Sequence, residues 1–108
     1  MVKFGSEPDV SFMKDDKMLA VIEVKGGIDP AGALERYGAA TKSFHHSIES
    51  GTQCRNFFLA AVFTSELKRR IRKDRLVEKT FDVIEILNDH KERETFFMEL
   101  FHHALRLV

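Results

Sequence analysis

The segment Met18–Val24 places the strongest constraint on the fold, because it stays apolar at successive positions until Glu23. Apolar side chains on both alternating faces are typical of a strand that is covered on its two sides. The segment therefore predicts an internal strand of a sheet flanked by helices. Glu23 and Lys25 stand at its end, where we expect the strand to emerge at the rim of the sheet.

A second strand is predicted just before this one, at Val10–Met13. The polar stretch Lys14–Lys17 between the two is suited to reverse the chain. The two strands should therefore form an antiparallel hairpin over residues 10–24.

The register of this hairpin decides which polar side chains meet. With a three-residue loop at 15–17, Asp9 lies opposite Glu23 with both side chains on one face, and Lys25 shares that face by the two-residue period. A register one residue away would send Asp9 to the other face of the sheet.

A helix is predicted over residues 30–48, because Asp29 can cap the free amides and Pro30 suits a first helical turn. Residues at three-and-four spacing give this helix one buried stripe: Leu34, Tyr37, Thr41, Phe44 and Ile48. The apolar run Phe57–Phe63 predicts a further central strand. The order strand, helix, strand is compatible with parallel pairing to the Glu23 strand.

The C-terminal half predicts a basic helix at 65–73 and a last helix at 89–107, whose apolar face includes Phe97, Leu100 and Phe101. Residues 81–87 are ambiguous between a short strand and an irregular approach to that helix. The expected fold is a single α/β domain over residues 1–108, with a mixed sheet of an antiparallel hairpin plus a parallel strand.

Asp9, Glu23 and Lys25 are the candidate catalytic residues. Two carboxylates can hold a hard cation such as Mg²⁺, and the backbone carbonyl of Val24 can add an oxygen ligand. A lysine beside them can orient a metal-bound water and offset negative charge on a phosphate. The competing interpretation is a surface hairpin with a simple Glu23–Lys25 ion pair.

The triplet of an acidic residue, any residue and a lysine occurs four times in the chain, so the triplet alone is weak evidence of a catalytic site. Only Glu23-Val24-Lys25 closes a buried strand. The other three lie in predicted turns or at helix starts: Asp15-Asp16-Lys17, Glu66-Leu67-Lys68 and Asp89-His90-Lys91.

Pro8-Asp9 and the continuation Glu-Val-Lys-Gly-Gly-Ile-Asp-Pro-Ala-Gly at 23–32 resemble the type II restriction endonucleases of the PD-(D/E)xK nuclease superfamily, in particular XcyI-like enzymes. The resemblance covers Glu7 to about Phe44 well. It implies a restriction-endonuclease-like core that cleaves double-stranded DNA with Mg²⁺. By this resemblance Asp9 and Glu23 are metal ligands and Lys25 is the catalytic lysine.

One family element has no counterpart here, because the family's common core begins with a helix and Met1 stands only eight residues before Asp9. We therefore expect the chain to resemble the C-terminal catalytic part of such an enzyme. It would then act as a homodimer or with the remainder of a larger nuclease. The alternative is a catalytically inactive remnant or subunit that acts in DNA binding or protein association.

Formal net charge is zero, so any affinity for DNA must be local. Six of the eight residues in 68–75 are basic. The candidate phosphate contacts are Arg36, Lys68, Arg69, Arg70 and Arg72, and Glu35 is a secondary site candidate. An ordinary solvated helix face explains the same basic segment equally well.

No stretch has the eighteen or more uninterrupted apolar residues of a membrane span, and the charged N-terminus does not resemble a signal peptide. A single cysteine, Cys54, fits a reducing compartment. We expect a cytoplasmic protein with no membrane partner.

Overall fold

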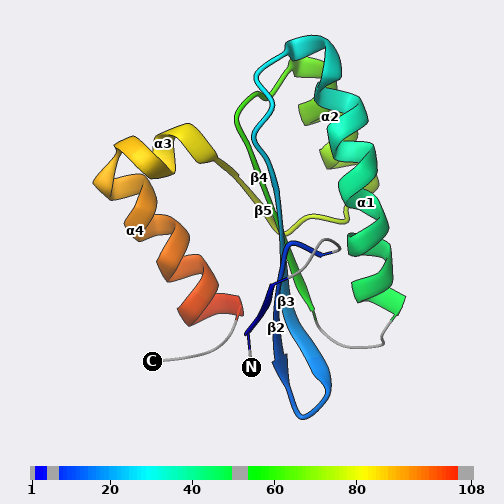
Figure 1. Cartoon of the computed structure of the whole chain (residues 1–108), viewed down its shortest axis with the longest axis vertical. Helices are drawn as coiled ribbons and strands as arrows, with labels where there is room; N and C mark the ends of the chain where they lie inside the picture. The colour runs from blue at the N-terminus through cyan, green and yellow to red at the C-terminus, as the bar shows by residue number, and fades with distance from the viewer. Residues whose placement is uncertain (1, 5–7, 50–53, 105–108) are drawn as a thin grey trace.

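The computed structural model describes residues 2–4, 8–49 and 54–104, which form an α/β fold around a mixed sheet. Five strands lie in the order β1-β2-β3-β4-β5 (Figure 1). Their bounds are Val2–Phe4 (β1), Val10–Lys14 (β2), Lys17–Lys25 (β3), Arg55–Ala60 (β4) and Lys79–Asp82 (β5). β1 to β3 form an antiparallel meander, and β3, β4 and β5 are parallel. The predicted mixed sheet is therefore confirmed.

Helices cover both faces of the sheet. A 3₁₀ turn at Pro30–Gly32 (η1) leads into α1, and a π-helical segment at Glu99–Ala104 (η2) continues α4. The α-helices are Ala33–Glu49 (α1), Ser65–Asp74 (α2), Val83–Asn88 (α3) and His90–Met98 (α4). α1 and α2 lie on one side of the sheet, and α3 and α4 lie on the other (Figure 1). No helix in the described residues is long and apolar enough to cross a membrane.

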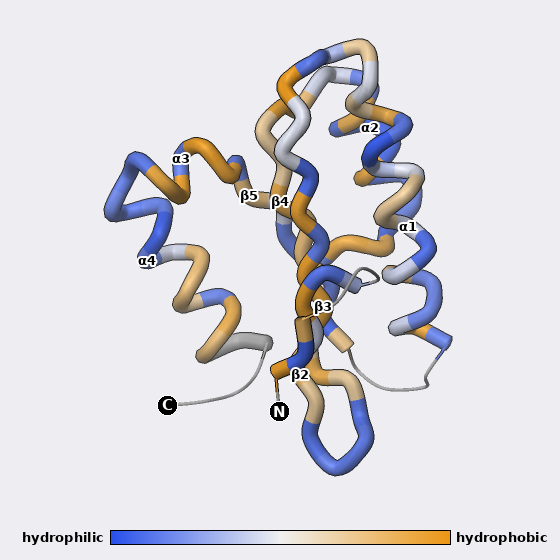
Figure 2. Tube along the Cα trace, in the orientation of Figure 1, coloured by the Kyte–Doolittle hydropathy of each residue, from blue (hydrophilic) through white to orange (hydrophobic). Residues whose placement is uncertain are grey.

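β3 is buried on both faces, as the sequence predicts. Val21 belongs to the core beneath α1 and α2, whereas Ala20 and Ile22 belong to the core beneath α4. Figure 2 shows apolar residues concentrated along the central strands and polar residues at the tip of the β2–β3 hairpin. Alternate residues of one strand therefore supply two cores on opposite sides of the sheet.

Phe58 of β4 organises the core beneath α1. Its ring makes edge-on contacts with Tyr37, Phe44 and Phe63, at centroid distances of 5.5, 6.3 and 6.1 Å. Such edge-to-face contacts are a favoured geometry for aromatic rings.

The predicted stripe of α1 is only partly right. Tyr37 and Phe44 are buried, but Leu34 and Ile48 are 37% and 48% exposed. The buried face consists of Ala33, Tyr37, Ala40, Ser43, Phe44 and Ser47. Small side chains between the two aromatic residues let the helix lie close to the sheet, so the buried stripe includes polar serines that hydropathy alone does not identify.

The β2–β3 turn differs from the predicted three-residue loop. It has two residues, Asp15 and Asp16, with φ of 52° and 64°, and Lys14 pairs with Lys17. Two successive left-handed residues are typical of the type I′ turn, whose twist matches that of the flanking strands. Aspartate tolerates this backbone conformation better than most residues.

A β-bulge then restores the predicted register. Met13 pairs with Met18 but Phe12 pairs with Ala20, so Leu19 is an extra residue on β3. Beyond the bulge Val10 pairs with Ile22, the alignment that a three-residue loop would have produced. The loop length was wrong, but the register near Asp9 is the predicted one.

Other boundaries also shift. The strand predicted at 57–63 spans Arg55–Ala60, and the basic helix predicted at 65–73 extends to Asp74. Thr64 accepts a hydrogen bond from the Leu67 amide at 3.1 Å, which fixes the start of α2 and leaves 61–64 as a connection.

The helix predicted at 89–107 begins at His90 and changes to π-helix at Glu99, and 105–107 lie outside the described residues. Phe96 and Leu100 are its buried residues, whereas Phe97 is 45% exposed. The ambiguous segment 81–87 is divided between β5 and α3, because the Asp82 carboxylate caps the amides of Ile84 and Glu85 at 2.8 and 3.2 Å.

Asn56 joins three elements through buried hydrogen bonds. Its side-chain oxygen accepts from the Ser47 hydroxyl of α1 at 2.7 Å, and its amide donates to the Leu76 carbonyl at 2.9 Å. Its backbone carbonyl accepts from the Glu78 amide at 2.7 Å. Asn56 is 2% exposed, so it fixes the α2–β5 connection against β4 and α1 without competition from water.

We expect Asn56→Ala to lower the free energy of unfolding by about 2–3 kcal/mol, because it removes the buried hydrogen bond with the Ser47 hydroxyl and takes away the donor to the Leu76 carbonyl. Urea unfolding followed by circular dichroism measures this change. Thr41→Ala is the matched control, since it removes one local hydrogen bond to Gly38 within α1 and should change stability by at most about 0.5 kcal/mol. Equal effects of the two variants would contradict the role of Asn56.

Candidate active site

Asp9 and Glu23 lie together where β2 begins and β3 ends. The Asp9 amide donates to Glu23 Oε1 at 3.3 Å, and Asp9 Oδ2 accepts from the Val24 amide at 2.8 Å. These two bonds extend the contact between the strands beyond Val10 and Ile22, the last pair of the ladder. The structure therefore brings the two carboxylates into one site.

Lys25 lies beside Glu23, with 3.9 Å between Lys25 Nζ and Glu23 Oε2. Residues 23 and 25 share one face of β3 by the period of a strand. The Lys25 carbonyl accepts from the Ala61 amide at 3.2 Å, which joins this end of β3 to the chain that follows β4. The Lys25 side chain is 27% exposed and the Glu23 side chain 3%, so the ammonium group connects a buried carboxylate with solvent.

The Val24 carbonyl points toward Asp9. The amide and the carbonyl of one strand residue point to the same side of the strand. Because the Val24 amide donates to Asp9, its carbonyl lies on the β2 side of β3. The Val24 carbonyl therefore lies on the same side of β3 as Asp9.

Glu23 does not emerge at the rim, which corrects the expectation from the sequence. It is 2% exposed, and the rim begins one residue later with Val24, which is 37% exposed. Ser43, buried on α1, lies close to the Glu23 carboxylate, although its hydroxyl has no hydrogen bond of regular geometry. The sequence did not identify Ser43, because its position near Glu23 depends on which face of α1 packs against the sheet.

Burial raises the pKa of Glu23 above its ordinary value, because a charged carboxylate loses solvation there. The nearby Asp9 carboxylate raises this pKa further. The Ser43 hydroxyl, the Asp9 amide and the Lys25 ammonium group lower it, but they do not cancel the effect of burial.

The donor set fits Mg²⁺. This cation is commonly held by one or two carboxylates and keeps several waters or substrate phosphate oxygens. Within the described residues no group of three or more histidine, cysteine or acidic side chains could hold a metal. Asp9 and Glu23, with the Val24 carbonyl, are the groups that could hold one here.

Arg36 is not directed to this site. Its guanidinium donates to the Asp29 carbonyl at 2.6 Å and lies over Gly27 and Gly32, where an added Cβ would come within 2.8 and 2.6 Å of it. Gly27 therefore makes room for Arg36. Glu35 is exposed, and no contact in the described chain joins it to Asp9 or Glu23.

The basic candidates on α2 divide into two groups. Arg70 forms an ion pair with Asp74 at 3.1 Å, and the buried Tyr37 hydroxyl also donates to Asp74, at 3.0 Å. Lys68, Arg69 and Arg72 are exposed and take part in no ion pair within 8–49 and 54–104. Arg70 thus has a structural role, and the other three remain free to bind a partner.

The chain matches no protein-family model, and neither curated proteins nor solved structures give a significant match. The likeness to restriction endonucleases therefore depends on the sequence motif alone. The chemistry of the site has to be argued from its own residues.

The raised pKa of Glu23 predicts that stability falls as pH rises from about 4.5 through the folded-state pKa, since the native state binds the extra proton in that window. Glu23→Gln removes this dependence, so the variant should gain stability relative to the wild type as pH increases. Urea unfolding at several values between about pH 4 and pH 8 measures the difference. Glu49→Gln, at an exposed position of α1, should follow the wild-type curve. Parallel curves for wild type and Glu23→Gln would contradict the assignment.

Proposed function

We propose that the chain hydrolyses DNA phosphodiester bonds with Mg²⁺, in the manner of a type II restriction endonuclease. The observation that supports this most is the pair of reciprocal hydrogen bonds that hold Asp9 against β3 beside Glu23, with Lys25 Nζ 3.9 Å from Glu23. Two carboxylates and one lysine at the end of a buried strand are what a metal-dependent phosphodiesterase needs.

Each group has a separate role in this proposal. Asp9 and Glu23 bind the cation together with the Val24 carbonyl. When bound, Mg²⁺ supplies a Lewis acid that stabilises charge on the phosphate and lowers the pKa of a coordinated water. Lys25 Nζ orients the attacking water and offsets negative charge as the phosphorus–oxygen bond to the leaving group breaks. Lys25 is half-buried, which allows its ammonium group to reach both Glu23 and a substrate phosphate.

Metal ligands act in their deprotonated form, so a proton competes with the cation for Glu23. Because the pKa of Glu23 is raised in the folded chain, cation binding should weaken as pH falls through that pKa.

Double-stranded DNA is the proposed partner, and we place the activity in the cytoplasm, where DNA and Mg²⁺ are both available. Two copies of the site could cut both strands in one encounter, so the proposal includes a homodimer or association with the remainder of a larger nuclease. Isologous dimers would present two copies of the Asp9–Glu23 pair to the two antiparallel strands.

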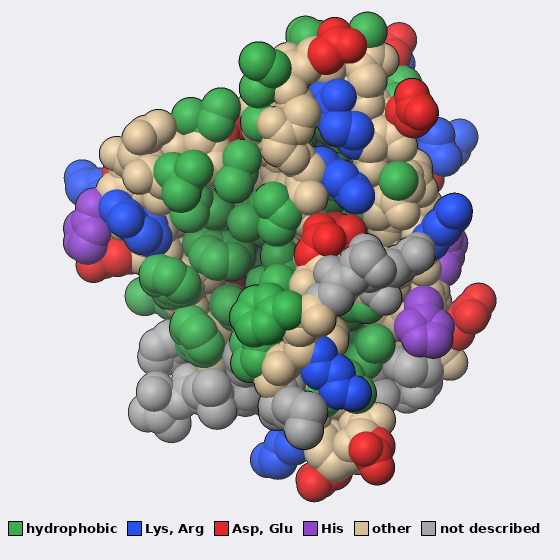
Figure 3. All heavy atoms as spheres, viewed as in Figure 1, with side chains coloured by type: hydrophobic (Ala, Val, Ile, Leu, Met, Phe, Trp, Pro, Cys, Tyr) green, Lys and Arg blue, Asp and Glu red, His purple; other side chains and the backbone are tan. Residues whose placement is uncertain are grey.

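A second candidate is a role in association without catalysis, and two observations favour it. Glu23 is 2% exposed, which restricts the access of a hydrated cation. Apolar side chains also gather between the sheet and the layer of α3 and α4 on the face drawn in Figure 3. On α4 and η2, Phe97, Met98 and Phe101 are 45%, 56% and 37% exposed, a surface that a protein partner could cover.

Supercoiled plasmid incubated with the protein and Mg²⁺ tests the enzymatic proposal. We expect nicked or linear products with the wild type and a rate at least about 100-fold lower for Lys25→Ala, because the lysine acts on the attacking water and the phosphate. Lys91→Ala is the control, since Lys91 is exposed at the start of α4, on the other face of the sheet.

Absence of cutting with any divalent metal would favour association over catalysis. Cutting that persists unchanged in Lys25→Ala would show that another site is responsible. Urea unfolding of each variant must accompany the assay, so that loss of activity is not confused with loss of fold.

A further inference from the structure

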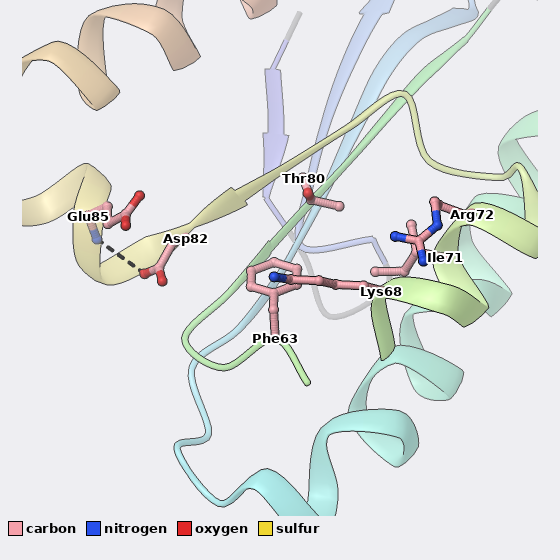
Figure 4. A pocket seen from close by; sticks show the side chains of 7 residues that line it. All are labelled: Phe63, Lys68, Ile71, Arg72, Thr80, Asp82 and Glu85. Atoms are coloured by element: carbon pink, nitrogen blue, oxygen red, sulfur yellow. Dashed lines mark hydrogen bonds between the residues drawn. The ribbon is translucent and has the colours of Figure 1, made fainter. Parts of the chain in front are cut away.

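A groove runs along the outer edge of the sheet, between α2 and β5. It consists of two adjoining cavities of about 510 and 450 Å³, which share Ile71, Arg72 and Thr80. The first is also lined by Phe63, Lys68, Asp82 and Glu85 (Figure 4), and the second by Arg75, Val77, Glu78 and Lys79. β5 is the edge strand of the sheet within residues 2–4, 8–49 and 54–104, so no strand of this part of the chain covers that side.

Three cations form a row along the helical wall of the groove. Lys68 and Arg72 are four residues apart, so they lie on one side of α2, with their Cα atoms about 6 Å apart along the helix axis. Arg75, the left-handed residue that follows the helix, lines the same groove beyond Arg72. Like charges at this spacing repel one another, so they do not stabilise the helix itself.

None of these three cations forms an ion pair in the part of the chain that the structure describes. By contrast Arg70, on the side of α2 that faces Tyr37, is bound to Asp74. On α2, Arg70 is therefore occupied by Asp74, whereas the cations in the groove are available to an anion.

The rest of the groove suits a nucleotide chain. Phe63 and Ile71 supply apolar surface, and Figure 4 shows Lys68 extending from α2 across the pocket and Thr80 placed on β5 opposite the helix. The Thr80 hydroxyl can donate a hydrogen bond to a phosphate oxygen. Alternate backbone amides on the outer side of an edge strand can do the same.

Carboxylates set the limits of the basic stretch. Asp82 and Glu85 lie at one end, where Asp82 caps α3, and Glu78 near the other end is bound to Arg55 at 2.6 Å. Between them the groove presents Lys68, Arg72 and Arg75. Attraction of a polyanion is therefore expected along the stretch between these carboxylates.

We propose that this groove binds the phosphates of one nucleic-acid strand. Lys68 and Arg72 stand about one helical turn apart, roughly 6 Å along the helix axis, so they can contact phosphates that follow each other along one strand. The choice of nucleic acid among polyanions rests on the proposed function. The groove itself is separate from the Asp9–Glu23 site, because β5 lies two strands away from β3.

Binding should therefore need no metal. Fluorescence anisotropy with a labelled single-stranded oligonucleotide in EDTA measures it at several salt concentrations. We expect Lys68→Ala/Arg72→Ala to weaken binding at least about 10-fold. The variant should also lower the slope of log affinity against log salt by about 1.4, since each lost phosphate contact removes about 0.7 for a single strand.

Lys42→Ala/Lys73→Ala is the matched control. It removes the same charge from exposed positions of α1 and α2, and neither residue lines the groove. This variant should keep wild-type affinity within about twofold. Equal losses in the two variants would overturn the proposal in favour of diffuse attraction to exposed cations.

The outcome is distinguishable from that of the plasmid assay. Metal-independent binding that is lost only in the groove variant supports the groove even if Lys25→Ala shows no effect on cutting. Mg²⁺-dependent cutting with no difference between the two double variants overturns the groove and leaves the active site in place.

Discussion

The double pairing of β3 is the constraint on which the structure depends. β3 pairs antiparallel with β2 on one side and parallel with β4 on the other, and its residues supply both cores. A strand placed in this way cannot shift its register without exposing apolar side chains and orphaning backbone groups on two sides. The position of Glu23 is therefore fixed as firmly as that of Val21, and Asp9 is held against it by the backbone of β3.

Holding Glu23 in this buried position lowers the stability of the folded chain. A carboxylate that is 2% exposed destabilises the fold when it is ionised, and only Lys25, the Asp9 amide and the Ser43 hydroxyl offset that cost. Natural proteins retain such groups where function needs them. A cation at Asp9 and Glu23 would remove the penalty, which links the electrostatics of the folded chain to the proposed chemistry. The groove along β5 has the complementary arrangement, with exposed cations that lack an anionic partner among the described residues.

Much of the site could be predicted because it follows from local rules. The period of a strand puts Glu23 and Lys25 on one face, and the hairpin puts Asp9 near Glu23. The loop was nevertheless predicted with the wrong length, and the register agrees only because Leu19 forms a bulge. Turn geometry and bulges depend on how the strands twist against their neighbours, so they are not encoded in hydropathy. The contact of Arg36 with the Asp29 carbonyl escaped prediction for a related reason, since it depends on the path of a glycine-containing loop.

The sequence by itself determined the mixed sheet, the central strand and the helix start at Asp29-Pro30, because each follows from the periodicity and chemistry of adjacent residues. Only the tertiary structure decided which side of α1 is buried, that Ser43 faces Glu23, that Asp74 takes Arg70 out of the basic surface, and that Lys68, Arg72 and Arg75 face a groove. These features join elements that are far apart in the chain. Their geometry is set by the packing of helices against the sheet, where side-chain volume and shape decide the outcome and sequence spacing does not.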